Sequence, residues 1–397
     1  MRFVKPGIKI NLDELVGYAL AIYFLFLPFS QIAIVPGISV IRIISILPFL
    51  ASITRVKQVI HERFLTEYFF IIVMCVWAVC TSFLSVSSQL SGFVSLVSNF
   101  AFIVFFSMFR YSRHEYEMLC KADIFSSWIA SLSIIYGFIS GGFLNSGRGG
   151  IVFLGQQIDP NFSCGYLVFA IASYTSVFLE TKKKKFLFLS LVLICISLIT
   201  GSRGGLMSTA GTFIIVLFLH VFKKKDLKAF FKIAVVLILL CIVFSVFIGF
   251  LPESIGARFS IESVISSRGT GRIDIWLELL SDFFHSHWQR IIFGNGLGAS
   301  VFFSSTGHFA HNSWLEYLLS FGLLGFCVCL AFYAYVFFSA YRNGEIALAS
   351  SIAGYYVLQL SLTAYTYRPL FNAILLLMIC KRNTASCPYS TQGFQNE

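Results

Sequence analysis

Residues 268–316 read RGTGRIDIWLELLSDFFHSHWQRIIFGNGLGASVFFSSTGHFAHNSWLE, and they join two strongly apolar parts of the chain. This is the longest run between apolar segments that is not itself continuously apolar. It holds four of the seven histidines, three arginines and a glycine-rich turn, namely His285, His287, His308, His311, Arg268, Arg272, Arg290 and Gly294–Gly298. Whether these groups form a site or decorate a loop depends on which side of a membrane they face.

The composition is that of a membrane protein. Hydrophobic residues make up 57% and charged residues 12% of the 397 residues, whereas a soluble domain carries about a quarter charged residues. Apolar runs of about 20 residues, the length of a membrane-crossing helix, recur along the chain. We therefore predict one all-α polytopic integral membrane domain over 1–397, with about twelve spans. These are 15–35, 38–53, 67–86, 91–109, 122–140, 163–180, 186–201, 205–221, 230–250, 313–339, 346–365 and 369–380.

The basic residues orient these spans. Twenty-one of the 29 lysines and arginines, all fourteen lysines among them, fall on the side that carries both termini. Cytoplasmic loops carry an excess of Lys and Arg, so this side is predicted to be cytoplasmic. The large loop 251–312 then lies on the extracytoplasmic, or periplasmic, face of an inner (plasma) membrane.

Every basic residue on the outer face is an arginine. The eight are Arg42, Arg148, Arg203, Arg258, Arg268, Arg272, Arg290 and Arg368. A guanidinium offers a planar fork that matches phosphate oxygens and stays charged in a poorly hydrated site. The set favours a phosphate ligand, and the alternative is that these arginines snorkel to lipid headgroups.

The outer loop 141–162 contains Arg148 and ends in Asp159-Pro160-Asn161. A carboxylate or amide followed by proline is typical of a helix start, with the side chain capping and proline in the first turn. Asp159 and Asn161 are also candidates for hydrogen bonds to a sugar.

Two further stretches indicate anion binding. Ser202-Arg203-Gly204 forms a tight turn between two spans, where a charge is costly unless it meets water, a partner or a ligand. Apolar spacing over 273–284 predicts an amphipathic helix along the outer membrane interface. Gly271 and Arg272 stand at its N-terminus, where free amides and the helix dipole attract anions. Arg268 is the reserve candidate.

The end of the large loop offers a proton acceptor. His311 stands at the start of a span, where an imidazole can exchange a proton near neutral pH. Asn312 and Glu316 follow it and join the predicted substrate-binding set, and His308 is the fallback for His311. His285 and His287 lack a convincingly spaced third ligand, so no metal site is predicted. The Gly294–Gly298 run follows no clear strand, so it indicates a tight turn rather than a dinucleotide site.

Together these motifs resemble the O-antigen polymerase and O-antigen ligase superfamily of bacterial membrane proteins. The resemblance rests on the Ser202-Arg203-Gly204 turn, Gly271-Arg272 with Trp276, the Phe293–Gly298 turn, His311-Asn312-x-x-Leu315-Glu316 and Gly322-x-x-Gly325. It covers about 200–330, with Asp159-Pro160-Asn161 as an upstream match.

The resemblance implies a GT-C-like glycosyltransferase that needs no metal or other cofactor. The donor would be a glycan on undecaprenyl pyrophosphate, with Arg203 and Arg272 on the pyrophosphate and His311 activating the acceptor hydroxyl. Arg148, Arg268, Asp159, Asn161, Asn312, Glu316 and His308 would contact substrate. Besides this oligosaccharide carrier, the expected partners are the bilayer and a chain-length regulator protein, with no nucleic acid.

Polymerase and ligase differ in the acceptor, which is another lipid-linked repeat unit or the lipid A core. The Asp-Pro-Asn loop and the His-Asn-x-x-Leu-Glu form favour a polymerase. A flippase or transporter of the lipid-linked sugar is a remote alternative, because such proteins carry internal repeats and mid-span charges, which are not evident here.

Overall fold

A computed structural model describes residues 14–61, 65–84, 90–141, 147–224, 242, 244–260, 262–263, 271–304, 307, 309–362 and 367–382. Its regular structure is almost entirely helical. The elements are α1 (Leu15–Leu25), η2 (Leu27–Phe29), β1 (Ala33–Val35), β2 (Ile38–Ser39), α2 (Val40–Ile44), α3 (Ile46–Ser52), η3 (Ile53–His61), α4 (Thr66–Leu84), α5 (Leu90–Ser107), α6 (Arg113–Ile139), β3 (Val152–Phe153), β4 (Gln156–Gln157), α7 (Pro160–Gly165), α8 (Val168–Thr181), α9 (Lys184–Ile199), α10 (Arg203–Lys224), α12 (Glu253–Gly256), η4 (Ala257–Phe259), α14 (Arg272–His285), α15 (Trp288–Phe293), α16 (Ala299–Phe303), α17 (Ser313–Arg342), α18 (Ile346–Gln359) and α19 (Arg368–Arg382).

The all-α membrane class agrees with these helices. Within the described residues, five apolar helices have the length and hydropathy to cross a membrane, at Thr66–Phe83, Arg113–Ile139, Pro160–Thr181, Arg203–Lys224 and Ser313–Arg342. Leu15–Leu25, Gly92–Ser107 and Ile346–Gln359 are shorter apolar helices. The predicted span 230–250 lies largely outside the described residues, and the number twelve stays a prediction.

Two predicted spans are not the continuous helices that hydropathy suggests. The span predicted at 15–35 ends as an α-helix at Leu25, and Pro28 lies in the 3₁₀ turn that follows. The span predicted at 38–53 divides into α2 and α3, with Pro48 two residues after the start of α3. Proline has no backbone N–H to donate and clashes with the preceding turn, which explains both breaks.

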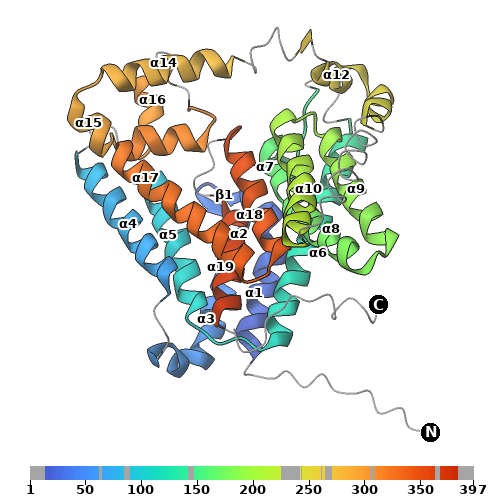
Figure 1. Ribbon diagram of the computed structural model, residues 1–397, viewed down its shortest axis with the longest axis horizontal. Coiled ribbons are helices and arrows are strands. Elements are labelled where there is room, and N and C mark those ends of the chain that lie inside the picture. Colours follow the sequence, from blue (N-terminus) through green and yellow to red (C-terminus); the bar gives the residue numbers. More distant parts are fainter. Residues whose placement is uncertain are drawn as a thin grey trace.

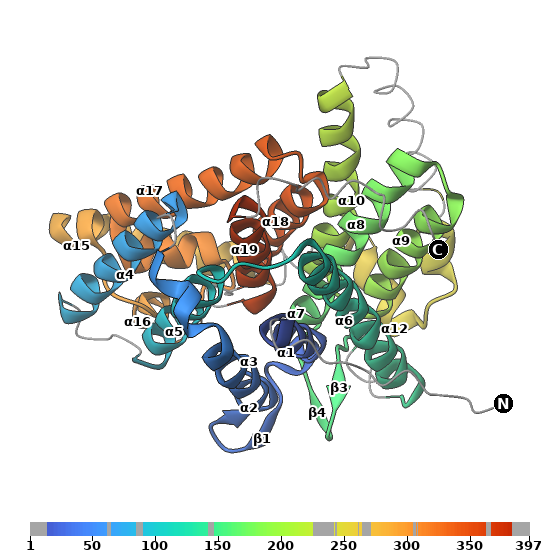
Figure 2. The same cartoon turned by 90° about the horizontal axis from the view of Figure 1, so that it is seen from below.

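The helices form two lateral groups around a central pair. Helices α4, α5 and α17 lie on one side, and α6, α8, α9 and α10 lie on the other (Figures 1 and 2). Helix α18 contacts both α10 and α17, and α19 contacts α5 and α6. Every residue of α19 from Pro369 to Cys380 is buried. A helix that is apolar all round is expected at the centre of a bundle, and α19 occupies that place.

Basic residues divide between the two ends of the helices. Helix α10 begins at Arg203 and ends at Lys223 and Lys224. At the lysine end, Arg55 pairs with Glu115 at 2.6 Å and Lys381 pairs with Glu67 at 2.7 Å. Helix α14 lies at the opposite end (Figure 1). Arg203 and the Lys223–Lys224 pair thus lie at opposite ends of α10, and which end faces the cytoplasm stays a prediction.

The glycine-rich run 294–298 is a loop that fits against a break in α17. Gly322 has φ 66° and ψ −176°, which interrupts the helix. The amides of Asn295 and Gly296 donate to Ser320 O at 3.1 and 2.9 Å. Trp77 Nε1 donates to Phe321 O at 2.9 Å. Carbonyls freed by a broken membrane helix need such internal donors, so this glycine run has a structural role.

Candidate active site

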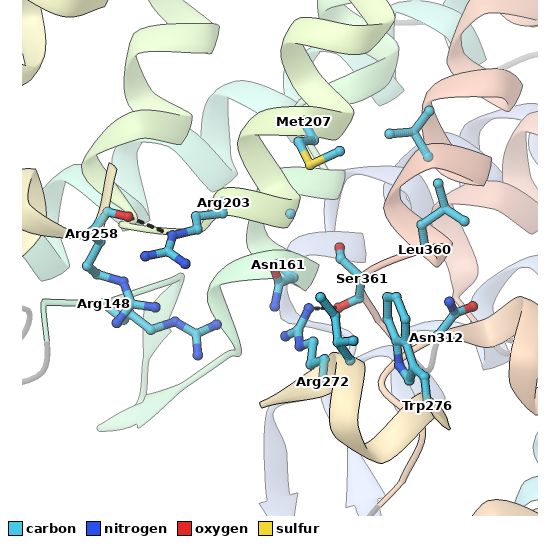
Figure 3. Close-up of a pocket in the computed structure, with 13 residues that line it drawn as sticks. Arg148, Asn161, Arg203, Met207, Arg258, Arg272, Trp276, Asn312, Leu360 and Ser361 are labelled. Atoms are coloured by element: carbon cyan, nitrogen blue, oxygen red, sulfur yellow. Dashed lines mark hydrogen bonds between the residues drawn. The ribbon is translucent and has the colours of Figure 1, made fainter. Parts of the chain in front are cut away.

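A cavity of about 440 Å³ lies where the N-terminal ends of α7, α10 and α14 meet the C-terminal end of α18. Figure 3 shows how its side chains face one another. The lining residues are Arg148, Asn161, Arg203, Gly204, Met207, Arg258, Arg272, Ile273, Trp276, Asn312, Val357, Leu360 and Ser361. One part is basic and another is apolar, as a site for an anionic amphiphile would be.

The Asp-Pro-Asn tripeptide builds one wall by starting α7. Asp159 is the N-cap, its carboxylate accepts from Asn161 N at 2.8 Å, and Pro160 occupies the first turn. The capping alternative is therefore confirmed for Asp159. The carboxylate also lies 3.7 Å from the Arg148 guanidinium. Asn161 is buried and lines the cavity, whereas the Asp159 side chain is not among the lining groups.

The Ser-Arg-Gly turn starts α10 and is fixed to α7. Ser202 Oγ donates to Asn161 Oδ1 at 2.5 Å and accepts from Gly205 N at 2.9 Å. A Cβ at Gly204 would lie 2.1 Å from Ser361 Oγ, so only glycine lets α10 approach this closely. The turn therefore sets the spacing between α7, α10 and the end of α18.

Arg203 projects from this turn toward the segment that precedes α14. Its Nε donates to Arg258 O at 2.6 Å, and its Nη2 donates to Ser263 Oγ at 2.5 Å. Arg258 Nε in turn donates to Gly201 O at 3.0 Å. The two arginines thus hold η4 against the α9–α10 turn.

Arg258 lines the cavity, but the sequence motifs did not select it as a site residue. It belonged to the outer arginine set, but no motif surrounded it and it was not assigned to the site. Burial first, and then the charges of Arg148 and Arg203, lower the pKa of the Arg258 guanidinium. The arginine-only outer face was the signal that could have selected it.

Arg272 enters from the opposite side on α14. Its Nη1 donates to Ser361 O at 2.8 Å, and Trp276, one turn further along the helix, donates through Nε1 to Ala310 O at 2.7 Å. The prediction of a helix over 273–284 is confirmed by α14. Leu279 and Phe283 are fully buried against α16 and α17, which fixes the direction of the helix.

Arg148 interacts electrostatically with two other arginines of the cavity, Arg258 and Arg272. Burial, followed by the charge of Arg148, lowers the pKa of Arg272, and the carboxylate of Asp159 opposes that shift. Arg148 therefore acts on both Arg258 and Arg272 from its place beside them (Figure 3). Like charges in a partly desolvated cavity repel one another, and an anion bound between them would relieve that repulsion.

The other predicted residues are placed differently. Asn312 lines the cavity and caps α17, accepting from Trp314 N at 3.0 Å. His311 is exposed, has a left-handed backbone with φ 49°, and lies next to the cavity without being among its lining residues. Glu316 is fully buried one turn into α17, and Ser320 Oγ donates to it at 3.4 Å. The structure thus does not bring Glu316 to the cavity.

Arg268 and His308 fall outside the described residues. Within the described part, His, Cys, Asp and Glu side chains form no group of three that could hold a metal ion. The chemistry that the cavity itself supports is binding of a phosphate-bearing ligand by guanidinium groups, with amide and hydroxyl donors beside them.

Residues 186–330 match the family model described as O-antigen ligase. The match confirms the resemblance to the O-antigen ligase and polymerase superfamily, and supports an enzyme of that broad type in membrane polysaccharide biosynthesis. A search of curated proteins finds no match to the chain. Arg203, Arg258, Arg272, His311 and Asn312 lie inside the matched segment, whereas Arg148 and Asn161 precede it.

Proposed function

We propose, from the premise that residues 186–330 belong to the O-antigen ligase and polymerase superfamily, that the chain is a polysaccharide polymerase. It transfers a glycan from undecaprenyl pyrophosphate to a sugar of another lipid-linked repeat unit of O-antigen, capsule or exopolysaccharide. The observation that carries the proposal is the cavity in which Arg148, Arg203, Arg258 and Arg272 meet an apolar wall.

The arginines act on the leaving group. The bond between the anomeric carbon and the pyrophosphate oxygen breaks, and its electron pair stays on the pyrophosphate. Preorganised guanidinium groups stabilise the charge where it develops, and they act strongly because the cavity is partly desolvated. In this mechanism arginine side chains, rather than a metal ion, stabilise the negative charge that develops on the pyrophosphate.

His311 acts on the acceptor. An acceptor hydroxyl oxygen forms the new bond on the opposite face of the anomeric carbon, which inverts the configuration, and its proton passes to the imidazole. The position of His311 directly before the cavity-lining Asn312 supports this role. His311 is exposed, so an acceptor sugar outside the arginine cavity can reach its imidazole.

The prenyl chain of the bound donor extends from the cavity into the bilayer past the apolar lining residues. Met207 on α10 and Leu360 after α18 line the cavity and are 60% and 45% exposed. Exposed apolar side chains on a membrane helix bundle face hydrocarbon, so a chain can pass between them into the bilayer. A pyrophosphate held by the arginines would then lie at the outer interface of the inner membrane, and both chain termini would lie in the cytoplasm.

Deletion of the gene, followed by gel analysis of the surface polysaccharide, tests the reaction. Where the polysaccharide is O-antigen, deletion of a polymerase leaves one repeat unit on the lipid A core. Naked core, with polymerised repeats retained on the carrier, would identify the alternative O-antigen ligase. Unchanged long polysaccharide would refute both.

A further inference from the structure

A second cavity, of about 760 Å³, lies between α1, α2, α3, α5 and the start of α19. It is larger than the arginine cavity and is lined by hydroxyl, amide, guanidinium and aromatic groups. Two of the eight outer arginines, Arg42 and Arg368, line it. The two cavities together therefore account for six of the eight.

The charged part of this second cavity contains a hydrogen-bond donor without an acceptor among the described residues. Arg42 sits on α2 and donates through Nη1 to Gly37 O, in the β1–β2 turn. Arg368 begins α19, and its Nη1 atom is buried without a hydrogen-bond acceptor among the described residues. The lining residues, all within the described ranges, include no carboxylate. A buried guanidinium N–H without an acceptor, as at Arg368, favours an anionic ligand.

The rest of the cavity suits an amphiphile. Phe49, Phe102 and Phe105 form an aromatic wall, and Ser98 and Asn99 supply polar groups. The outward face of α2 and α3 is apolar and exposed, with Ile46 at 53% and Leu50 at 59%. Such a face is expected to contact hydrocarbon, so a lipid chain can reach this cavity from the bilayer.

A single turn of helix separates the two cavities. Asn161 lines the first cavity, and its neighbour Phe162 lines the second. Tyr367 reinforces the partition by donating from its hydroxyl to Phe162 O at 2.8 Å. Ligands bound in the two cavities would therefore lie on either side of the short helix α7.

We propose that the second cavity is the acceptor site, and that it binds a prenyl-pyrophosphate-linked glycan through Arg42 and Arg368. The prenyl chain lies along the phenylalanine wall, and the sugars reach past Phe162 toward the donor. This inference rests on the proposed polymerase function. An anionic bilayer phospholipid offers the same chemistry, and the experiment separates the two sources.

The test counts bound lipid. Full-length protein in dioleoylphosphatidylcholine nanodiscs is titrated with undecaprenyl pyrophosphate, and the lipids retained per chain are counted by native mass spectrometry. Wild type is expected to retain two. Arg42→Gln/Arg368→Gln and Arg203→Gln/Arg272→Gln are each expected to retain one, with the remaining affinity within twofold of wild type.

A cavity-filling variant guards against misfolding. Ser98 is exposed, so Ser98→Phe is expected to keep the thermal unfolding temperature and to weaken the second lipid at least tenfold. Retention of two lipids by both Arg42→Gln/Arg368→Gln and Ser98→Phe would overturn the acceptor site. Displacement of the second lipid by an equal concentration of dioleoylphosphatidylglycerol would overturn it too, because it would identify a phospholipid site.

The two proposals fail differently. One lipid on wild type, lost in Arg203→Gln/Arg272→Gln, would refute the acceptor site and leave the polymerase proposal standing. No lipid on wild type would refute the donor site, and the acceptor inference would fall with it.

Discussion

Replacing Arg272 by lysine tests whether the cavity recognises the shape of the pyrophosphate or only its charge. The guanidinium already uses Nη1 to hold Ser361 O at 2.8 Å. Its other N–H groups can form a fork on phosphate oxygens, whereas lysine keeps the charge and loses the fork. A hydrogen bond to a charged group contributes about 1.5–3 kcal/mol. Loss of one such bond in the transition state lowers kcat/KM by about 10- to 150-fold.

The assay measures transfer by the purified full-length enzyme in nanodiscs, with a defined undecaprenyl-pyrophosphate-linked repeat unit as donor and acceptor. Arg290→Lys is the matched control, because Arg290 is another outer arginine on α15, exposed and outside the cavity lining. It should keep wild-type kcat/KM. If Arg272→Lys also keeps wild-type kcat/KM while Arg272→Ala loses it, a point charge suffices and bidentate recognition is wrong.

Three further predictions concern the residues around Arg272. His311→Gln should abolish transfer while undecaprenyl pyrophosphate binding stays within about twofold, because the imidazole moves a proton and the arginines bind the donor; equal loss of both would make His311 a binding residue. Ser202→Ala should lower unfolding stability by about 1–3 kcal/mol, because it leaves Gly205 N without its 2.9 Å acceptor; an unchanged unfolding temperature in detergent would contradict this. Gly204→Ala should lower unfolding stability by about 1–3 kcal/mol through overpacking, because Ser361 Oγ lies 2.1 Å from the added Cβ. It should also reduce donor binding. Wild-type donor binding would show that Ser361 and the end of α18 can shift to make room for the methyl group.

The position of the glycine-rich turn at Gly294–Gly298 is explained by the structure and not by the sequence. Their spacing predicts a tight turn, but the turn alone gives no reason for its position. The structure supplies one, since a Cβ at Gly294 would lie 2.3 Å from Ser320 O. The loop must come this close because it donates to the carbonyls exposed where α17 breaks at Gly322.

The sequence by itself determined the all-α membrane class and the long apolar helices, and it predicts the arginine-only outer set, because hydropathy, helical spacing and charge bias are local properties of the chain. It also selected Arg148, Asn161, Arg203 and Arg272, which the cavity brings together. Only the tertiary structure separated Asp159 as a cap from Asn161 as a lining residue, and buried Glu316 away from the cavity.

Arg258 shows most clearly which site residues the sequence alone does not predict. It reaches the site through a hydrogen bond to Gly201, 57 residues earlier in the chain. Contacts over such separations depend on how the helices pack, and no local pattern records them. The division of the outer arginines between two cavities was likewise decided by the placement of one helical turn, α7, between them.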